Sequence, residues 1–230
     1  MITALLIWLF KKYAMPALNR HRNTGILKFI IPTKNAAALI LMLVITKPLF
    51  AQPAQEQITK YNVLHSGKVV GHMDLYQKRT GDDVYLKMIS AVKMRFIFSI
   101  RVDCNEESFF QNGKLVSSHV QRKVNGKEKA NRITKCAGDG YQTIAEGKSG
   151  KVDQKEISNN LMLLYCHEPA DNMEVYSDNF QRFLKVKQTG DHIYRIDLPD
   201  GNYNYYSYTN GICSKVDIHH SLYTIQIQLA

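Results

Sequence analysis

Apolar side chains occupy every even-numbered position from residue 92 to residue 104, whereas most odd-numbered positions between them are charged or polar. Successive residues of a β-strand point to opposite faces of a sheet, so this period of two predicts one long strand with a buried face. The same alternation at residues 223–229 predicts another strand. The even positions of the first run are Val92, Met94, Phe96, Phe98, Ile100, Val102 and Cys104.

Two dipeptides, Asn112-Gly113 and Asn125-Gly126, follow the first of these strands. Asn and Gly tolerate the positive φ angles of two-residue hairpin turns, so the pattern predicts three antiparallel strands in a meander. Such turns place Cys104 opposite Gln121. At about 3.3 Å per residue, Cys136 is then offset from Cys104 by roughly 20 Å. A bridge between these two cysteines is therefore not expected unless bulges shift the register.

About ten short strands can be counted along the chain, without the alternation of strands and helices that a parallel sheet requires. We therefore predict an all-β fold, a single curved antiparallel meander sheet that forms a half-barrel or open barrel around an apolar concavity. Residues 157–166 are the ambiguous segment. The spacing of Ile157, Leu161 and Leu164 fits one face of a short helix, while the adjacent Leu163-Leu164-Tyr165 also suits a strand.

The N-terminal region has the order of a signal peptide. An uncharged apolar run, Ala36–Thr46, follows several basic residues, and no acidic residue precedes Glu56. Small or aliphatic residues at the cleavage positions predict cutting between Ala51 and Gln52, which makes residues 1–51 a leader and residues 52–230 a single β-rich domain. A membrane anchor is the alternative, but a spanning helix needs roughly 20 apolar residues and this run is shorter. We expect a periplasmic or secreted product without a stable transmembrane anchor.

The leader changes the charge and the disulfide chemistry of the remainder. Residues 1–51 contain seven of the 30 Lys and Arg and none of the 20 Asp and Glu, so the remainder carries 23 basic against 20 acidic residues, or +3. This balance gives no reason to expect nucleic acid as a partner. The four cysteines of an exported chain can form disulfides. We predict Cys166 to Cys213 as the candidate bridge.

Four segments carry a family resemblance that covers nearly the whole of residues 52–230. They are the hairpin Tyr61–Gly71, the turn Phe110-x-x-Gly113-x-Leu115, Leu164-Tyr165-x-x-Glu168-Pro169, and the run from Leu198 to Gly211. In these segments the chain resembles an uncharacterised family of exported proteins from Gram-negative bacteria. Such families look distantly similar to the lipoprotein-carrier half-barrels of the cell envelope. The resemblance implies a curved sheet and an envelope location, and it supplies no catalytic residues.

Clusters of potential ligands and nucleophiles have simpler interpretations. His219 and His220 are neighbours on a predicted strand and point to opposite faces, so we expect no metal site there. The pair Cys166 and His167 has the groups of a nucleophile and its base, but neighbouring side chains seldom face each other, and a structural role for Cys166 is favoured. The common hydrolase and phosphate-binding motifs are absent. We expect no cofactor and favour a protein that is not an enzyme.

Two groups of residues are candidates for binding. A basic hairpin around Asn125-Gly126 is suited to lipid phosphates or an acidic partner, or it serves only as a solvated hairpin whose charge prevents edge pairing. Its members are Arg122, Lys123, Lys127, Lys129, Arg132 and Lys135. The cluster Tyr203, Tyr205, Tyr206 and Tyr208 is suited to a glycan or lipid site, or to packing within the sheet.

The leading hypothesis is an envelope protein that holds a lipid or another apolar ligand in its curved sheet by burial of apolar surface. The candidate contact residues are Phe96, Phe98, Ile100, Val102, Tyr206 and Tyr208. Two alternatives remain. One is an extracytoplasmic hydrolase with an unrecognised site, and the other is a structural or partner-binding module, for which an envelope protein is the expected partner. The oligomeric state is open.

Overall fold

The computed structural model describes residues 54–95, 99–154, 156–221 and 223–230. Within these residues, fourteen strands form one antiparallel sheet. The predicted leader and its cleavage site at Ala51 and Gln52 lie outside the described residues. The strands are β1 (Gln55–His65), β2 (Lys68–Thr80), β3 (Asp83–Arg95), β4 (Ser99–Gln111), β5 (Lys114–Val124), β6 (Lys127–Ala137), β7 (Gly140–Ala145), β8 (Lys148–Val152), β9 (Glu174–Ser177), β10 (Arg182–Gly190), β11 (Ile193–Asp197), β12 (Tyr203–Thr209), β13 (Ile212–His220) and β14 (Tyr223–Leu229).

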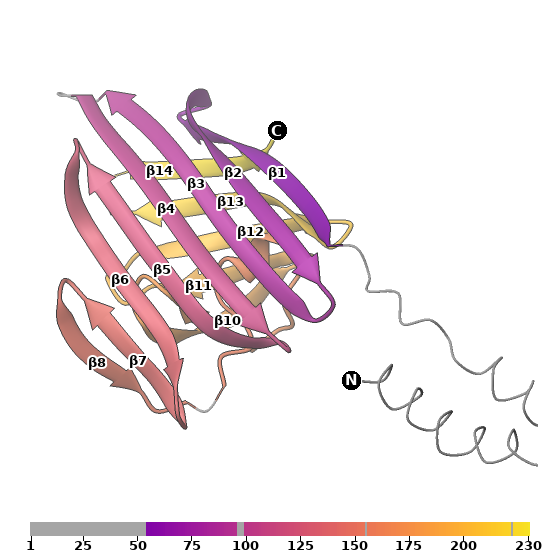
Figure 1. The fold of residues 1–230 in the computed structure, drawn as a ribbon. Coiled ribbons are helices and arrows are strands. Elements are labelled where there is room, and N and C mark those ends of the chain that lie inside the picture. The colour runs from indigo at the N-terminus through magenta and orange to yellow at the C-terminus, as the bar shows by residue number, and fades with distance from the viewer. Residues whose placement is uncertain (1–53, 96–98, 155, 222) are drawn as a thin grey trace, which may run out of the picture. The chain divides into compact units, whose positions relative to one another are not determined.

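The sheet is a meander whose first and last strands meet in its middle. Strands β1 to β8 follow one another on one side, β14 back to β9 on the other, and the pairing of β1 with β14 joins the two runs. Strands β8 and β9 are the two edges, so the sheet does not close. Figure 1 shows β1–β8 as a front layer of diagonal strands and β10–β14 behind them, running across the view. The prediction of a single, curved and open antiparallel sheet is confirmed.

The prediction of one long strand over residues 92–104 is wrong, because this stretch contains the end of β3 and the start of β4. The two strands pair with Met94 opposite Ile100 and Val92 opposite Val102. Directly opposed residues point to the same face of a sheet. Each pair of opposed residues on β3 and β4 joins two even-numbered or two odd-numbered positions. The even positions therefore face inward on both strands, and the alternation continues unchanged from β3 into β4.

The two Asn-Gly turns form as predicted, with Gln111 opposite Lys114 and Val124 opposite Lys127. The predicted register beyond the first turn is wrong by one residue. Phe109 and Phe110 lie opposite Ser117 and Leu115, so β5 has one extra residue, Val116, in a bulge that places Cys104 opposite Arg122 instead of Gln121. A bulge adds one residue to one strand only, which exchanges the inward and outward sides of all residues that follow it.

The segment between β8 and β9 packs inside the curved sheet. Its only helical element in the described part of the chain is a 3-10 turn at Leu163–Tyr165, where a short helix was one of two predictions. Ile157 and Leu164 have no exposed surface. The backbone N–H of Leu115 donates to the carbonyl of Ile157 at 2.8 Å, and the Tyr208 hydroxyl donates to the carbonyl of Leu164 at 2.8 Å. The core therefore lies between the two layers, around this segment.

No helix among the described residues is long and apolar enough to cross a membrane.

Candidate functional site

The inner face of β3, β4 and β5 changes from buried to half-buried along the strands. Near the Asn112-Gly113 turn, Leu86, Phe110 and Leu115 are at most 2% exposed, and they belong to the core cluster around residues 157–165. At the other end of the same strands, four inward-facing apolar residues remain half-buried. We call this group the half-buried end, and its members are Val92, Ile100, Val102 and Val124.

The half-buried end is continuous across three neighbouring strands. Val102 lies opposite Val92 on one side and opposite Val124 on the other, and Ile100 is two residues further along β4. Val92 packs against the core cluster, and Met94 beside Ile100 is itself buried. The result is an apolar strip that starts at the core and keeps part of its surface accessible to solvent.

Polar residues lie on the inner face between the half-buried end and the core. They are Cys104 and Glu106 on β4 and Arg122 on β5, all half-buried. The Cys104 thiol donates to Glu106 Oε1 at 3.4 Å. Burial is the main cause that raises the pKa of the Glu106 carboxyl, and the nearby charge of Arg122 opposes the shift. Burial and the charge of Glu106 raise the pKa of Cys104 to about 12, so this thiol is not an activated nucleophile.

A second polar group is fully buried next to this site. Asn160 has no exposed surface, and its Nδ2 donates to Ser108 Oγ at 2.9 Å and to Asp178 Oδ2 at 2.8 Å. Its Oδ1 accepts from the backbone N–H of Leu163 at 3.1 Å. Burial raises the pKa of Asp178 to about 7, and the charge of Glu106 acts in the same direction. Asn160 therefore ties the inner segment to β4 and to the loop after β9.

The six predicted contact residues occupy three different environments. Ile100 and Val102 belong to the half-buried end. Phe96 and Phe98 lie outside the described residues. Tyr206 and Tyr208 are only 3% and 6% exposed and belong to the packed core, where the ring of Tyr206 meets Tyr165 edge-on.

Tyr203 and Tyr205, the other two members of the predicted tyrosine cluster on β12, lie on the outer face. The guanidinium of Arg195 lies 4.0 Å from the ring centre of Tyr203, and His219 stacks with the same ring at 4.7 Å. Tyr205 contacts both Tyr203 and His219 edge-on. Alternation along β12 thus divides the cluster between core and surface, and the cluster does not line one site.

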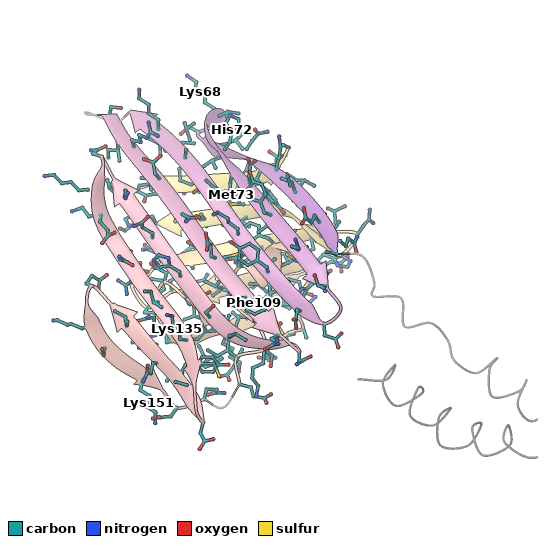
Figure 2. The ribbon with its side chains drawn as sticks, viewed as in Figure 1. Lys68, His72, Met73, Phe109, Lys135 and Lys151 are labelled. Atoms are coloured by element: carbon teal, nitrogen blue, oxygen red, sulfur yellow. The ribbon has the colours of Figure 1, made fainter. Side chains whose placement is uncertain are left out.

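The residues of the predicted basic hairpin are also divided between the inner face and exposed positions. Arg122 lies opposite Ala130, and Arg132 lies opposite Val120 and pairs with Glu146 at 2.9 Å. Ala130 and Val120 are buried, so both arginines lie on the inner face. The remaining members are exposed, and Figure 2 labels Lys135 on the outer side of β6. Anion binding by these residues stays a prediction, and the structure places its four lysines, Lys123, Lys127, Lys129 and Lys135, at exposed positions.

All four cysteines are free thiols in the structure. Cys213 is buried and Cys166 is half-buried, and burial raises the pKa of Cys166 to about 11 and that of Cys213 to about 12. A charge on Cys166 would raise the pKa of Cys213 further, so the two thiols lie within electrostatic range of each other. Their predicted bridge stays a prediction.

Cys166 and His167 open onto different hollows. His167 lines a hollow of about 400 Å³ with Val84 and Phe110, whereas Cys166 lines a neighbouring hollow of about 170 Å³ with Gln55. Burial lowers the pKa of His167. This arrangement favours the structural interpretation of Cys166 over a nucleophile and base pair. The described residues contain no group of three or more His, Cys, Asp or Glu that could hold a metal ion.

Sequence reasoning missed the inward orientation of Glu106 and Arg122. Glu106 continues the even-numbered alternation of β4 and could have been found by extending the pattern beyond Cys104. The inward orientation of Arg122 depends on the bulge in β5 and does not follow from the turn register. On β5 the apolar residues Val120 and Val124 are even-numbered, and this pattern indicates that the even positions face inward despite the register that the turn alone predicts.

The fold and its inner face define a domain built from one open antiparallel β-sheet, with a packed interior at one end. Residues 61–230 match the family DUF6134, a domain of unknown function, and the chain belongs to this family. A β-barrel-like protein of the domain of unknown function DUF1849 from Brucella abortus is similar to this chain with a TM-score of 0.47 and 11% sequence identity, over 78% of this chain and 97% of that one. No curated protein matches the chain.

Proposed function

We propose that this chain is an exported envelope protein without enzymatic activity, which holds the apolar part of a ligand against the half-buried end. One observation carries the proposal. Along the same three strands, the inner face is fully packed near residues 157–165, but Ile100, Val102 and Val124 keep exposed surface. A ligand that covers this surface gains about 25 cal/mol per Å² of apolar area.

A matched pair of substitutions tests this site. Val102→Gln places an amide in the half-buried end, whereas Ile89→Gln makes the same change on the outer face, where Ile89 is 42% exposed. We expect the full chain to bind N-phenyl-1-naphthylamine, a neutral apolar fluorophore. Burying an amide without a partner costs about 1–3 kcal/mol, so Val102→Gln should weaken binding by about five- to 150-fold. Fluorescence titration gives both dissociation constants.

The Ile89→Gln variant should bind the fluorophore as the unchanged chain does. Equal effects of the two substitutions, or no saturable binding by the unchanged chain, would contradict the proposed site. Denaturant unfolding of both variants shows whether a loss of binding reflects a loss of folded protein.

Export is the second part of the proposal, and it rests on the apolar run and basic flank before Ala51. When the full chain is produced in a Gram-negative host, N-terminal sequencing of the periplasmic fraction should begin at Gln52. Ala51→Phe places a bulky ring where the signal peptidase needs a small residue, so processing should fall strongly. A cytoplasmic product that retains residues 1–51 would contradict export.

A further inference from the structure

Arg122 is a cation on the inner face of the sheet. It lies between Val120 and Val124 on β5, opposite Cys104 on β4. Its Nη2 donates to Asn179 Oδ1 at 2.7 Å. The side chain is half-buried, and no carboxylate of the described residues lies within ion-pair distance of it.

The neighbouring inward arginine is different. Arg132, on the next strand, has an ion pair with Glu146 at 2.9 Å. The lysines of the same hairpin are exposed, so water solvates their charges. The charge of Arg122 has no ion pair among the described residues, and because the side chain is half-buried, water solvates it only in part. A guanidinium has five N–H donors; Asn179 accepts from one of them, and the Cys104 thiol is a second side-chain partner of Arg122.

A carboxyl on the inner face interacts electrostatically with this charge without forming an ion pair with it. Glu106 lies opposite Val120, diagonally across from Arg122. Burial raises the pKa of Glu106, whereas the hydrogen bond from Cys104 and the charge of Arg122 lower it. A partly buried cation that has no carboxylate within ion-pair distance attracts an anion from outside. An arginine also presents a fork of donors that fits the two oxygens of a carboxylate.

We propose that the ligand is an anionic amphiphile, a long-chain carboxylate whose head binds Arg122 while its chain covers Val102 and Val124. This inference rests on the proposed function and adds the chemistry of the ligand head to it. The half-buried end supplies the apolar contact and Arg122 the charge, side by side on β4 and β5. A free anion would use the arginine only, and a neutral amphiphile would use the apolar strip only.

Calorimetric titration of the full chain with dodecanoate, dodecanol and inorganic phosphate separates these cases. Dodecanoate and dodecanol share a chain and differ in the charge of the head. We expect dodecanoate to bind about ten- to a hundred-fold more tightly than dodecanol, because a hydrogen bond to a charged group is worth about 1.5–3 kcal/mol. Inorganic phosphate should bind much more weakly than dodecanoate.

Arg122→Met removes the charge and keeps the length of the side chain, and it should reduce dodecanoate affinity to that of dodecanol without changing dodecanol affinity. Lys123→Met removes the same charge from the adjacent outer position and should preserve the preference. Arg122→Lys keeps the charge and should keep part of the preference, which provides a second variant if Arg122→Met does not fold.

Equal affinities of the unchanged chain for dodecanoate and dodecanol would overturn this inference and leave the proposed function standing. Phosphate binding as tight as dodecanoate binding would also overturn it, since the chain would then contribute nothing. If neither amphiphile binds, the proposed function fails as well.

Discussion

Asp178→Asn is expected to raise the free energy of unfolding by up to about 4 kcal/mol at about pH 8 and to leave it nearly unchanged at about pH 4. The folded-state pKa of Asp178 is raised to about 7, chiefly by burial, from an ordinary value of 3.8. The folded protein therefore binds this proton more tightly than the unfolded chain does. The stability that comes from binding this proton is fully present below the unfolded-state pKa and is lost as the pH rises through about 7.

Denaturant unfolding of the unchanged chain and the variant across this pH range gives the difference directly. Asn resembles the neutral acid in shape and can accept the hydrogen bond of Asn160, so it isolates the effect of charge. Asp139→Asn, at an exposed turn, is the control and should show the pH dependence of the unchanged chain. A variant Asp178→Asn that is less stable at every pH would contradict the assignment of a disfavoured charge.

Asn160→Ala should lower the free energy of unfolding by about 3–5 kcal/mol, because it leaves several buried polar groups without partners. Asn160 bonds to Ser108, Asp178 and the backbone of Leu163, and none of its surface is exposed. The substitution should therefore loosen the inner segment from β4. Equilibrium unfolding in urea measures the loss.

Asn159→Ala is the matched control, since the adjacent Asn159 is half-buried and its contact with Tyr176 uses the backbone carbonyl, which alanine retains. We expect a loss of well under half that of Asn160→Ala. Similar losses in the two variants would show that the side-chain bonds of Asn160 do not connect the segment to the sheet.

The fold class could be predicted because alternation and turn chemistry are local properties. Asn112 and Asn125 adopt positive φ angles of 50° and 49°, as the two-residue turns require. Strand ends were less predictable. The hairpin of β3 and β4 preserves even-numbered inward positions, so nothing in the period of two shows where one strand ends and the next begins.

The candidate site was predictable only in part, because it depends on contacts between distant segments. Ile100 and Val102 follow from alternation, whereas the inward side of Arg122 depends on a bulge. The burial of Tyr206 depends on residues 157–165 folding back between the layers. Local sequence patterns do not reveal which strands such a segment will cover.

The binding of an amphiphile at the half-buried end is tested most directly by photo-crosslinking. Dodecanoate with a diazirine on its chain would be bound to the full chain and photolysed, and the labelled residues located by mass spectrometry. We predict labels on the inner-facing residues Val92, Val102 and Val124, suppressed by excess unlabelled dodecanoate. Labels confined to outer-facing residues such as Lys123, or labels that the competitor does not reduce, would contradict the account.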